Sequence, residues 1–239
     1  MKKYRILAVT LARGGSKSIK KKNIYKINGK PLLYYTIKEA LKSKLITRYI
    51  VSTDDREIQK IAIKYGAECP FLRPKKLAGD KSSAAQADIH ALKWAEKNEG
   101  CKYDFFVELM ATNPLKTYKD IDNVLKKLIK TGADSVIGMV KLEDHHPLRI
   151  KKIVNGRIAN FKKNLIEIPE GERQDLKPAA YIRNGSIYAS RRNLLIKEKR
   201  YGTKNSLPYI MNESNSVNID TKRDLILADI LIKKNKKLL

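Results

Sequence analysis

The chain has 239 residues, 42% of them hydrophobic and 32% charged, which is globular composition and excludes a largely disordered chain. No apolar run in the sequence is long enough to cross a bilayer. The formal net charge is +26, but the lysines are spread along the whole chain and aromatic residues are only 7%. We interpret the charge as a solvated surface that favours polyanionic substrates, and we expect neither a membrane nor nucleic acid as a partner.

Strand and helix patterns alternate through the first 140 residues. Apolar strands are expected at about 5–10, 49–53, 105–110 and 134–140. Helices are expected after Pro31, from Asp54-Asp55, over about 83–98 and after Pro114. This alternation predicts an α/β fold with a mostly parallel, Rossmann-like sheet between two helical layers. Ligands of such sheets bind beyond the carboxyl ends of the strands.

The pattern changes after residue 140. Two short apolar stretches flank Asn155-Gly156 and predict a β-hairpin with a type I′ turn over 150–161. A strand at 186–189 and a last helix from Asp220-Thr221 follow. We therefore expect one domain over 1–239, with an inserted, hairpin-containing arm at about 141–180. Because His145 and His146 stand at the base of this arm without a carboxylate at ligand spacing, we interpret them as structural.

The cysteine content and the N-terminus both indicate a cytoplasmic protein. Cys69 and Cys101 form no CxxC pair and no zinc-type spacing, which fits a reducing compartment. The apolar part of residues 1–9 is too short for a signal peptide, so we interpret it as the first strand.

A glycine-containing loop follows the first predicted strand, over 11–18. Two adjacent glycines, Gly14 and Gly15, let a backbone approach a phosphate closely, and Arg13 and Lys22 add positive charge. The loop is not a Walker A motif, because the leading glycine and the order before the lysine differ. On its own it is also compatible with a simple strand-to-helix turn.

Several segments in the same order resemble the acylneuraminate cytidylyltransferases, the CMP-sialic acid synthetases. The resemblance covers nearly the whole chain and rests on Leu11–Lys17 with Lys22-Asn23, Ile50–Asp55, Leu72-Arg73-Pro74, Leu77–Asp80, Thr112–Leu115, His145-His146-Pro147, Arg173-Gln174, Asn184–Tyr188 and Ile219-Asp220-Thr221. It implies a nucleotidyltransferase fold and a reaction in which CTP and a nine-carbon α-keto acid sugar give a CMP-sugar and pyrophosphate. It also implies a homodimer, with the arm crossing to a partner subunit.

The resemblance further implies roles for individual residues. Arg13, Lys22 and Asp220 are the expected catalytic residues. The expected nucleotide site consists of Leu11, Ala12, Arg13, Gly15, Ser16, Lys22, Asn23 and Arg73, with the backbone at Leu11-Ala12 and the Arg73 side chain near the base. The expected sugar site consists of Thr112, Asn113, Arg173, Gln174 and Asn184. An arginine offers a fork of donors to phosphate oxygens, and a lysine offers a point charge.

The expected metal site departs from the family pattern of two aspartates that flank an isoleucine. Here Asn218 takes the first position and Asp220 keeps the second. Mg²⁺ binds with one or two carboxylates plus substrate phosphates and water, so we expect Asp220 and Asn218 to hold it. The alternative role for Asp220 is the N-cap of the last helix, and the two roles are compatible.

A second departure concerns the sugar. Relatives commonly carry Gln-Pro-Thr-Ser-Pro after the central strand, whereas this chain has Met110-Ala111-Thr112-Asn113-Pro114. Loss of the glutamine removes a hydrogen-bonding group and favours a less hydroxylated sugar, of the legionaminate or pseudaminate type. Two other functions stay open at this point: transfer of another nucleotide to a sugar phosphate, and a non-catalytic nucleotide- or RNA-binding relative.

Overall fold

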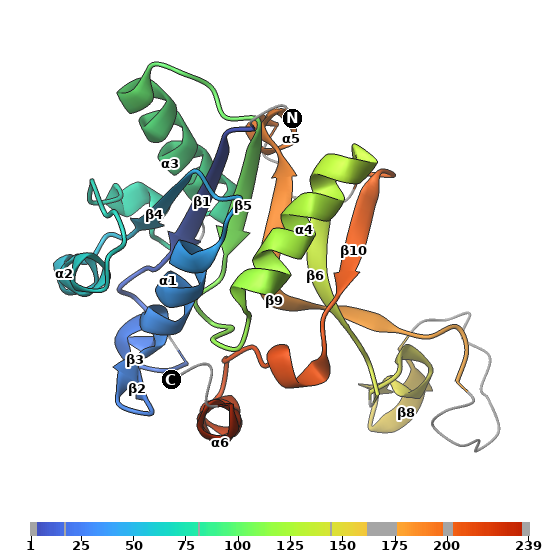
Figure 1. Ribbon diagram of the computed structural model, residues 1–239. Coiled ribbons are helices and arrows are strands. Elements are labelled where there is room, and N and C mark those ends of the chain that lie inside the picture. Colours follow the sequence, from blue (N-terminus) through green and yellow to red (C-terminus); the bar gives the residue numbers. More distant parts are fainter. Residues whose placement is uncertain are drawn as a thin grey trace.

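A six-stranded sheet forms the centre of the described part of the protein (Figure 1). The structure is a computed structural model that describes residues 4–16, 18–80, 82–143, 145–161, 176–197 and 203–235. The strand order is β10-β6-β9-β5-β1-β4. The strands are β1 (Ile6–Leu11), β4 (Arg48–Ser52), β5 (Phe105–Leu109), β6 (Ser135–Lys141), β9 (Tyr181–Arg191) and β10 (Ser206–Ile210).

The sheet is mostly parallel, as predicted. Strand β1 pairs in parallel with β4 and β5, and β10 pairs in parallel with β6. Strand β9 lies between β5 and β6 and is antiparallel to both. It reaches this place directly from β6 through the arm, because an antiparallel neighbour needs no crossover helix. Strand β9 is longer than the predicted 186–189, and β10 was not predicted.

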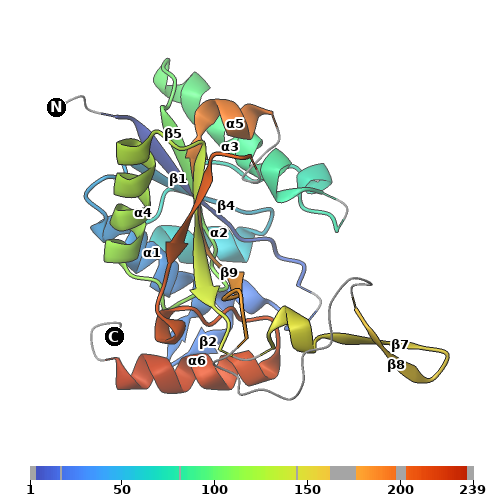
Figure 2. The same cartoon turned by 90° about the vertical axis from the view of Figure 1, so that its right-hand side faces the viewer.

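Helices cover both faces of the sheet, which confirms the three-layer prediction (Figure 2). One face packs against α1 (Leu32–Lys42), α2 (Arg56–Lys64) and α4 (Tyr118–Thr131), and the other against α3 (Ala84–Glu99) and α5 (Arg192–Ile196). Alternation along β1 explains the two cores: Ile6 and Ala8 belong to the first hydrophobic cluster, and Leu7 and Val9 to the second. Among the described residues no helix is long and apolar enough to span a membrane.

The last helix, α6 (Lys222–Lys234), packs on a third cluster together with the small sheet of β2 (Lys26–Ile27) and β3 (Lys30–Pro31). Its N-cap is Thr221, which forms a capping box with Asp224. The alternative role considered for Asp220 is therefore wrong: the neighbouring threonine caps the helix, and the Asp220 carboxylate points elsewhere.

The predicted hairpin is present as β7 (Lys151–Val154) and β8 (Arg157–Asn160), and it projects away from the sheet (Figures 1 and 2). Asn155 and Gly156 both have positive φ, as a type I′ turn requires. At the base of the hairpin, His146 is buried, with Nε2 3.0 Å from the carbonyl oxygen of Pro178 and Nδ1 accepting from the Leu148 amide. These contacts agree with the structural role expected for His146.

Candidate functional site

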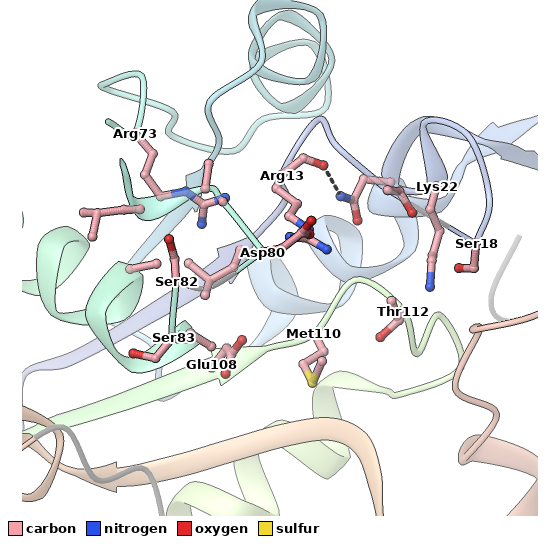
Figure 3. A pocket seen from close by; sticks show the side chains of 18 of the residues that line it. Arg13, Ser18, Lys22, Arg73, Asp80, Ser82, Ser83, Glu108, Met110 and Thr112 are labelled. Carbon is pink, nitrogen blue, oxygen red and sulfur yellow. Dashed lines mark hydrogen bonds and ion pairs between the residues drawn. The ribbon is translucent and has the colours of Figure 1, made fainter. Parts of the chain in front are cut away.

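A cleft of about 530 Å³ opens beyond the carboxyl ends of β1 and β5 (Figure 3). Parallel strands bring these ends to one edge of the sheet, so two loops far apart in sequence share the cleft. The segment before α6 supplies Asp220 from a third direction. The lining residues are Leu11, Arg13, Ser16, Ser18, Lys22, Asn23, Arg73, Leu77, Ala78, Gly79, Asp80, Ser82, Ser83, Ala84, Ala87, Glu108, Met110, Thr112 and Asp220.

Gly14 fixes the course of the loop after β1. A Cβ atom at this position would lie 2.7 Å from Oδ2 of Asp55, so only glycine fits. The Gly14 amide donates to Oδ1 of Asp54 at 3.0 Å. Gly15 is exposed, and a Cβ atom there would meet nothing within 4 Å. The glycine at position 14 therefore serves the packing of the loop against the start of α2, and its amide is already engaged.

Cationic side chains are distributed along the cleft, and each has an acidic neighbour. In Figure 3, Arg73 lies at one end and Lys22 at the other, with Arg13 and Asp80 between them. Arg13 Nη1 lies 3.0 Å from Asp80 Oδ1, and Arg73 Nη2 lies 3.8 Å from Asp54 Oδ1. The Arg13–Asp80 pair is exposed and therefore contributes little to stability. An incoming polyanion can displace Asp80 from Arg13 at low cost.

Lys22 and Asn23 connect the loop to the rest of the wall. Lys22 is nearly buried, and its Nζ donates to the carbonyl oxygen of Ile219 at 2.8 Å and to Asp220 Oδ1 at 3.0 Å. Asn23 Nδ2 donates to the carbonyl oxygen of Arg13 at 3.0 Å. The residue before Lys22, Lys21, has left-handed backbone dihedrals that turn the chain into the short 3₁₀ helix Lys22–Ile24.

Arg73 is the most deeply buried cation of the wall, with 3% of its side chain exposed. Burial lowers the pKa of its guanidinium, while Asp54 and Asp88 raise it. Its Nε atom is buried without a hydrogen-bond partner among the described residues. The pKa of His90 is lowered mainly by burial and, to a smaller extent, by the positive charge of Arg73. The His90 ring packs edge-on against Phe71. His90 is thus a packed histidine of α3.

Asp220 carries an exposed carboxylate of the cleft, with 66% of its side chain accessible, compared with 53% for Asp80. Oδ1 lies against Lys22, and Oδ2 accepts from Nδ2 of Asn218 at 2.6 Å. Oδ1 of Asn218 is buried, without a hydrogen-bond partner among the described residues. The accessible Asp220 carboxylate fits a divalent cation that takes its other ligands from phosphates and water. The Asn218 group that faces this carboxylate is the Nδ2 donor, and the buried Oδ1 lies on the Gly185 side. Within the described residues no cluster of three metal-ligating side chains exists.

The structure brings together most, but not all, of the residues predicted for the site. Leu11, Arg13, Ser16, Lys22, Asn23, Arg73, Thr112 and Asp220 line the cleft. Ala12, Gly15, Asn113, Asn184 and Asn218 do not contribute to its wall. Arg173 and Gln174 lie outside the described residues.

The asparagines among these have structural contacts. Asn113 is fully buried and its Oδ1 accepts from the Leu115 amide, which closes the turn after β5. Asn184 is buried and donates to Ser216 Oγ at 3.0 Å, across to the segment before α6. Both residues therefore support the wall from behind in this structure.

Sequence reasoning did not assign Asp80, Ser82, Ser83 and Glu108 to the cleft, although they line it. A signal for Glu108 was available, because it is the one charged residue within the apolar strand Phe105–Leu109. Ser83 is the N-cap of α3, with its side chain accepting from the Gln86 amide. Serine before a helix is so common that it gives no functional signal.

The arrangement can bind a polyphosphate and a metal ion at one end and a planar or hydroxylated group at the other. Arg13 and Lys22 supply charge, and preorganised charges that face a developing anion are the main means of stabilising phosphoryl transfer. Met110 and Thr112, on the turn after β5, form a separate part of the wall.

A cytidylyltransferase family model matches residues 7–231 of the chain. The chain is 33% identical to post-translational flagellin modification protein B of Campylobacter coli, over 95% of both chains. It is 30% identical to CMP-N,N′-diacetyllegionaminic acid synthase of Campylobacter jejuni, over 95% of this chain and 94% of that one. It is 31% identical to pseudaminic acid cytidylyltransferase of the same species, over 96% and 97%.

A solved structure of CMP:2-keto-3-deoxy-manno-octonic acid synthetase complexed with CTP superposes with a TM-score of 0.69. It covers 96% of this chain and 99% of its own, at 16% sequence identity. At 16% identity this likeness establishes only the fold. The fold is the α/β nucleotidyltransferase fold that the sequence predicted.

If Lys22 neutralises phosphate, Lys22→Gln weakens tripolyphosphate binding about tenfold, or about 1.4 kcal/mol. The measurement is the rise in Tm of each variant as tripolyphosphate is added, since a ligand of the native state stabilises it by mass action. The matched control is Lys20→Gln, because Lys20 is exposed and does not line the cleft. Equal losses in the two variants would show that only overall charge attracts the anion.

Proposed function

The chain belongs to the cytidylyltransferase family, and we propose that it transfers the cytidylyl group of CTP to a nine-carbon α-keto acid sugar, with release of pyrophosphate. The observation that carries the proposal is the convergence of Arg13, Lys22, Arg73 and Asp220 around one cleft. Relatives named for legionaminic and pseudaminic acids, 30% and 31% identical over nearly the full chain, support this class of acceptor.

In the proposed reaction, the anomeric hydroxyl oxygen bonds to the α-phosphorus and the bond from that phosphorus to the pyrophosphate oxygen breaks. The hydroxyl proton passes to solvent. Arg13 and Lys22 balance the charge of the triphosphate and hold it for in-line attack. Leu11, Ala12 and Asn23 position the nucleotide, and Arg73, held in place by burial, lies near the base.

We propose Mg²⁺ as the divalent metal, bound by Asp220 and assisted by Asn218. When bound, the metal would supply Lewis-acid chemistry at the α-phosphate. Lys22 Nζ donates to Asp220 Oδ1, and a bound triphosphate offers this ammonium other oxygens. The Asp220 carboxylate is then available to the cation.

The acceptor sugar lies, in this proposal, against Met110 and Thr112. A thioether has no strong hydrogen-bonding group, so this wall favours a deoxygenated, acylamino-bearing sugar over N-acetylneuraminate. Legionaminate- and pseudaminate-type acids have this character. Arg173 and Gln174 remain expected contacts of the sugar carboxylate.

A homodimer formed through the arm is also part of the proposal. Apolar side chains of the hairpin are exposed: Ile153 by 68%, Ile158 by 75% and Phe161 by 63%. Ile153 and Ile158 are directly opposite each other across the two strands. A two-stranded hairpin is marginal in water and exposed apolar patches mark interaction surfaces, which supports burial of the arm against a second subunit.

The location that we propose is the cytosol. Both Cys69 and Cys101 are free thiols, and burial raises the pKa of the Cys69 thiol to about 11, which makes it unreactive. Free, unreactive thiols are typical of a reducing compartment.

The first test is pyrophosphate release with Mg²⁺, with CTP, GTP, UTP and ATP each combined with N-acetylneuraminate, legionaminate and pseudaminate. We expect release with CTP alone, and faster with one of the two deoxy sugars than with N-acetylneuraminate. Release with GTP and a sugar phosphate in place of an acid sugar would overturn the assignment of both substrates.

The variant Met110→Gln is the control for the acceptor side. A glutamine can hydrogen-bond a sugar hydroxyl, so the ratio of kcat/KM for N-acetylneuraminate to that for the preferred deoxy sugar should rise. An unchanged ratio would remove Met110 from the acceptor wall.

Asp220→Asn should lower kcat by about 100-fold at saturating CTP, because it removes the carboxylate that would hold the metal. The measurement is pyrophosphate release against Mg²⁺ concentration. The companion variant Asn218→Asp adds a second carboxylate and should reduce the Mg²⁺ concentration needed for half-maximal rate. Wild-type activity in Asp220→Asn would contradict the proposed metal ligand.

For the dimer, light scattering after size-exclusion chromatography should give twice the mass of the 27.3 kDa chain. Ile158→Lys should shift the protein toward the monomer mass, because a buried lysine in an apolar interface is unfavourable. Ile63→Lys is the matched control, since Ile63 is exposed by 57% but lies on α2, away from the arm. A monomeric wild type would refute the dimer and leave the reaction untouched.

A further inference from the structure

Lys116 is a fully buried lysine whose ammonium group is surrounded by oxygen atoms. It lies between β5 and α4 and has no exposed surface. Its Nζ donates to Thr36 Oγ1 at 2.8 Å, to the Met110 carbonyl oxygen at 2.7 Å and to the Asn113 carbonyl oxygen at 2.5 Å. An ammonium has three N–H donors, and here each of them has an acceptor.

The electrostatic environment requires these bonds. Burial lowers the pKa of Lys116 to about 7, while the carboxylates of Glu39 on α1 and Asp120 on α4 raise it. A buried charge is expensive unless it is hydrogen-bonded, and a buried donor without a partner is costly as well. The three acceptors and the lysine therefore stabilise one another, and this geometry explains why an apolar residue does not occupy the position.

Two of the three acceptors are the ends of one turn. Met110 and Asn113 are the first and last residues of the turn after β5, and the Asn113 amide also donates to the Met110 carbonyl oxygen at 3.4 Å. Met110 and Thr112, within this turn, line the cleft. The third acceptor, Thr36, belongs to α1. One ammonium thus attaches the turn to a helix of the scaffold from behind.

The turn 110–113 also supports the segment that carries Asp220. The Ile219 amide donates to the Thr112 carbonyl oxygen at 2.8 Å, and the Ile219 carbonyl oxygen accepts from Lys22 Nζ at 2.8 Å. Lys22 also contacts Asp220. Hydrogen bonds linked by short stretches of backbone therefore lead from Lys116, which is fully buried, through the turn and Ile219 to Lys22 and Asp220, the two groups expected to hold phosphate and metal.

We propose that Lys116 is a positioning residue of the cleft: it holds the turn 110–113, and through the Thr112–Ile219 hydrogen bond it also sets the place of Lys22 and Asp220. It contacts no substrate. The kinetic part of this inference rests on the proposed cytidylyl transfer, and the structural part does not.

The kinetic test compares Lys116→Met, which keeps the aliphatic stem and removes every donor, with Lys116→Arg, which keeps the charge and the donors. In Lys116→Met the KM for the acceptor sugar should rise about tenfold and kcat should fall, because the wall and the Asp220 segment lose their support. The KM for CTP should change less, since Arg13 and Arg73 lie on other loops. Lys116→Arg should recover part of the loss.

The matched control is Lys119→Met, an exposed lysine on the neighbouring helix α4. If folded Lys116→Met shows wild-type kcat and acceptor KM while its stability alone changes, Lys116 is only a core residue and the proposal is wrong. If Lys116→Met does not fold, Thr36→Val serves instead, because it removes one acceptor at nearly constant volume. It should raise the acceptor KM in the same direction by about two- to threefold, and an unchanged KM would again overturn the proposal.

A second readout needs no substrate. Hydrogen exchange of the Ile219 amide should be faster in Lys116→Met than in wild type and in Lys119→Met, because its acceptor, the Thr112 carbonyl oxygen, is less fixed. Unchanged protection of Ile219 would refute the hydrogen-bond series. A wild-type enzyme that is inactive with every nucleotide and sugar would refute the proposed function, and this exchange measurement would still decide the role of Lys116.

Discussion

The hydrogen bond from Lys22 to Ile219 is the interaction on which the cleft depends, because it joins the two ends of the chain. The two residues are 197 positions apart, yet Nζ and the carbonyl oxygen lie 2.8 Å from each other. The loops after β1 and β5 and the segment 73–87 line the cleft on its other sides. The segment before α6 closes the third side, and its place is fixed by this lysine from one direction and by the turn after β5 from the other.

The cationic groups of the cleft are held in position by acidic neighbours before a ligand arrives. Asp80, Asp220 and Asp54 accompany Arg13, Lys22 and Arg73, respectively. Electrostatic catalysis requires charges that are already oriented, since reorientation during the reaction would consume the advantage. Of the three pairs, Arg13–Asp80 is exposed on both sides and contributes little to stability, so Asp80 orients Arg13 without holding it tightly. The net charge of +26 attracts anions to the surface, but these local pairs give the cleft its geometry.

The sequence was sufficient to predict helices and strands with a strong hydrophobic periodicity and to locate residues that lie within short motifs. The apolar run Phe105–Leu109 and the stripe of α4 gave the sheet and its helical layers, and the motif around Arg13 and Lys22 gave the cleft. The sequence was not sufficient for residues whose role depends on contacts with distant parts of the chain. The family resemblance implies a sugar-binding role for Asn113 and Asn184, and only the fold reveals that Asn113 Oδ1 and Asn184 Nδ2 also make buried contacts. Lys116 looks like one of many surface lysines, because no local pattern reveals the three oxygens that enclose it.

The two departures from the family pattern, Met110 and Asn218, lie on neighbouring segments that one hydrogen bond connects, from the Ile219 amide to the Thr112 carbonyl oxygen. Backbone atoms form this bond, so it is independent of which side chains the two segments carry. A fixed backbone frame lets the acceptor wall and the metal-binding segment change their side chains without losing their relative position. A change of substrate in such a site therefore needs few substitutions. The condition is that the buried side chains that hold the two backbone segments, Lys116 above all, stay in place.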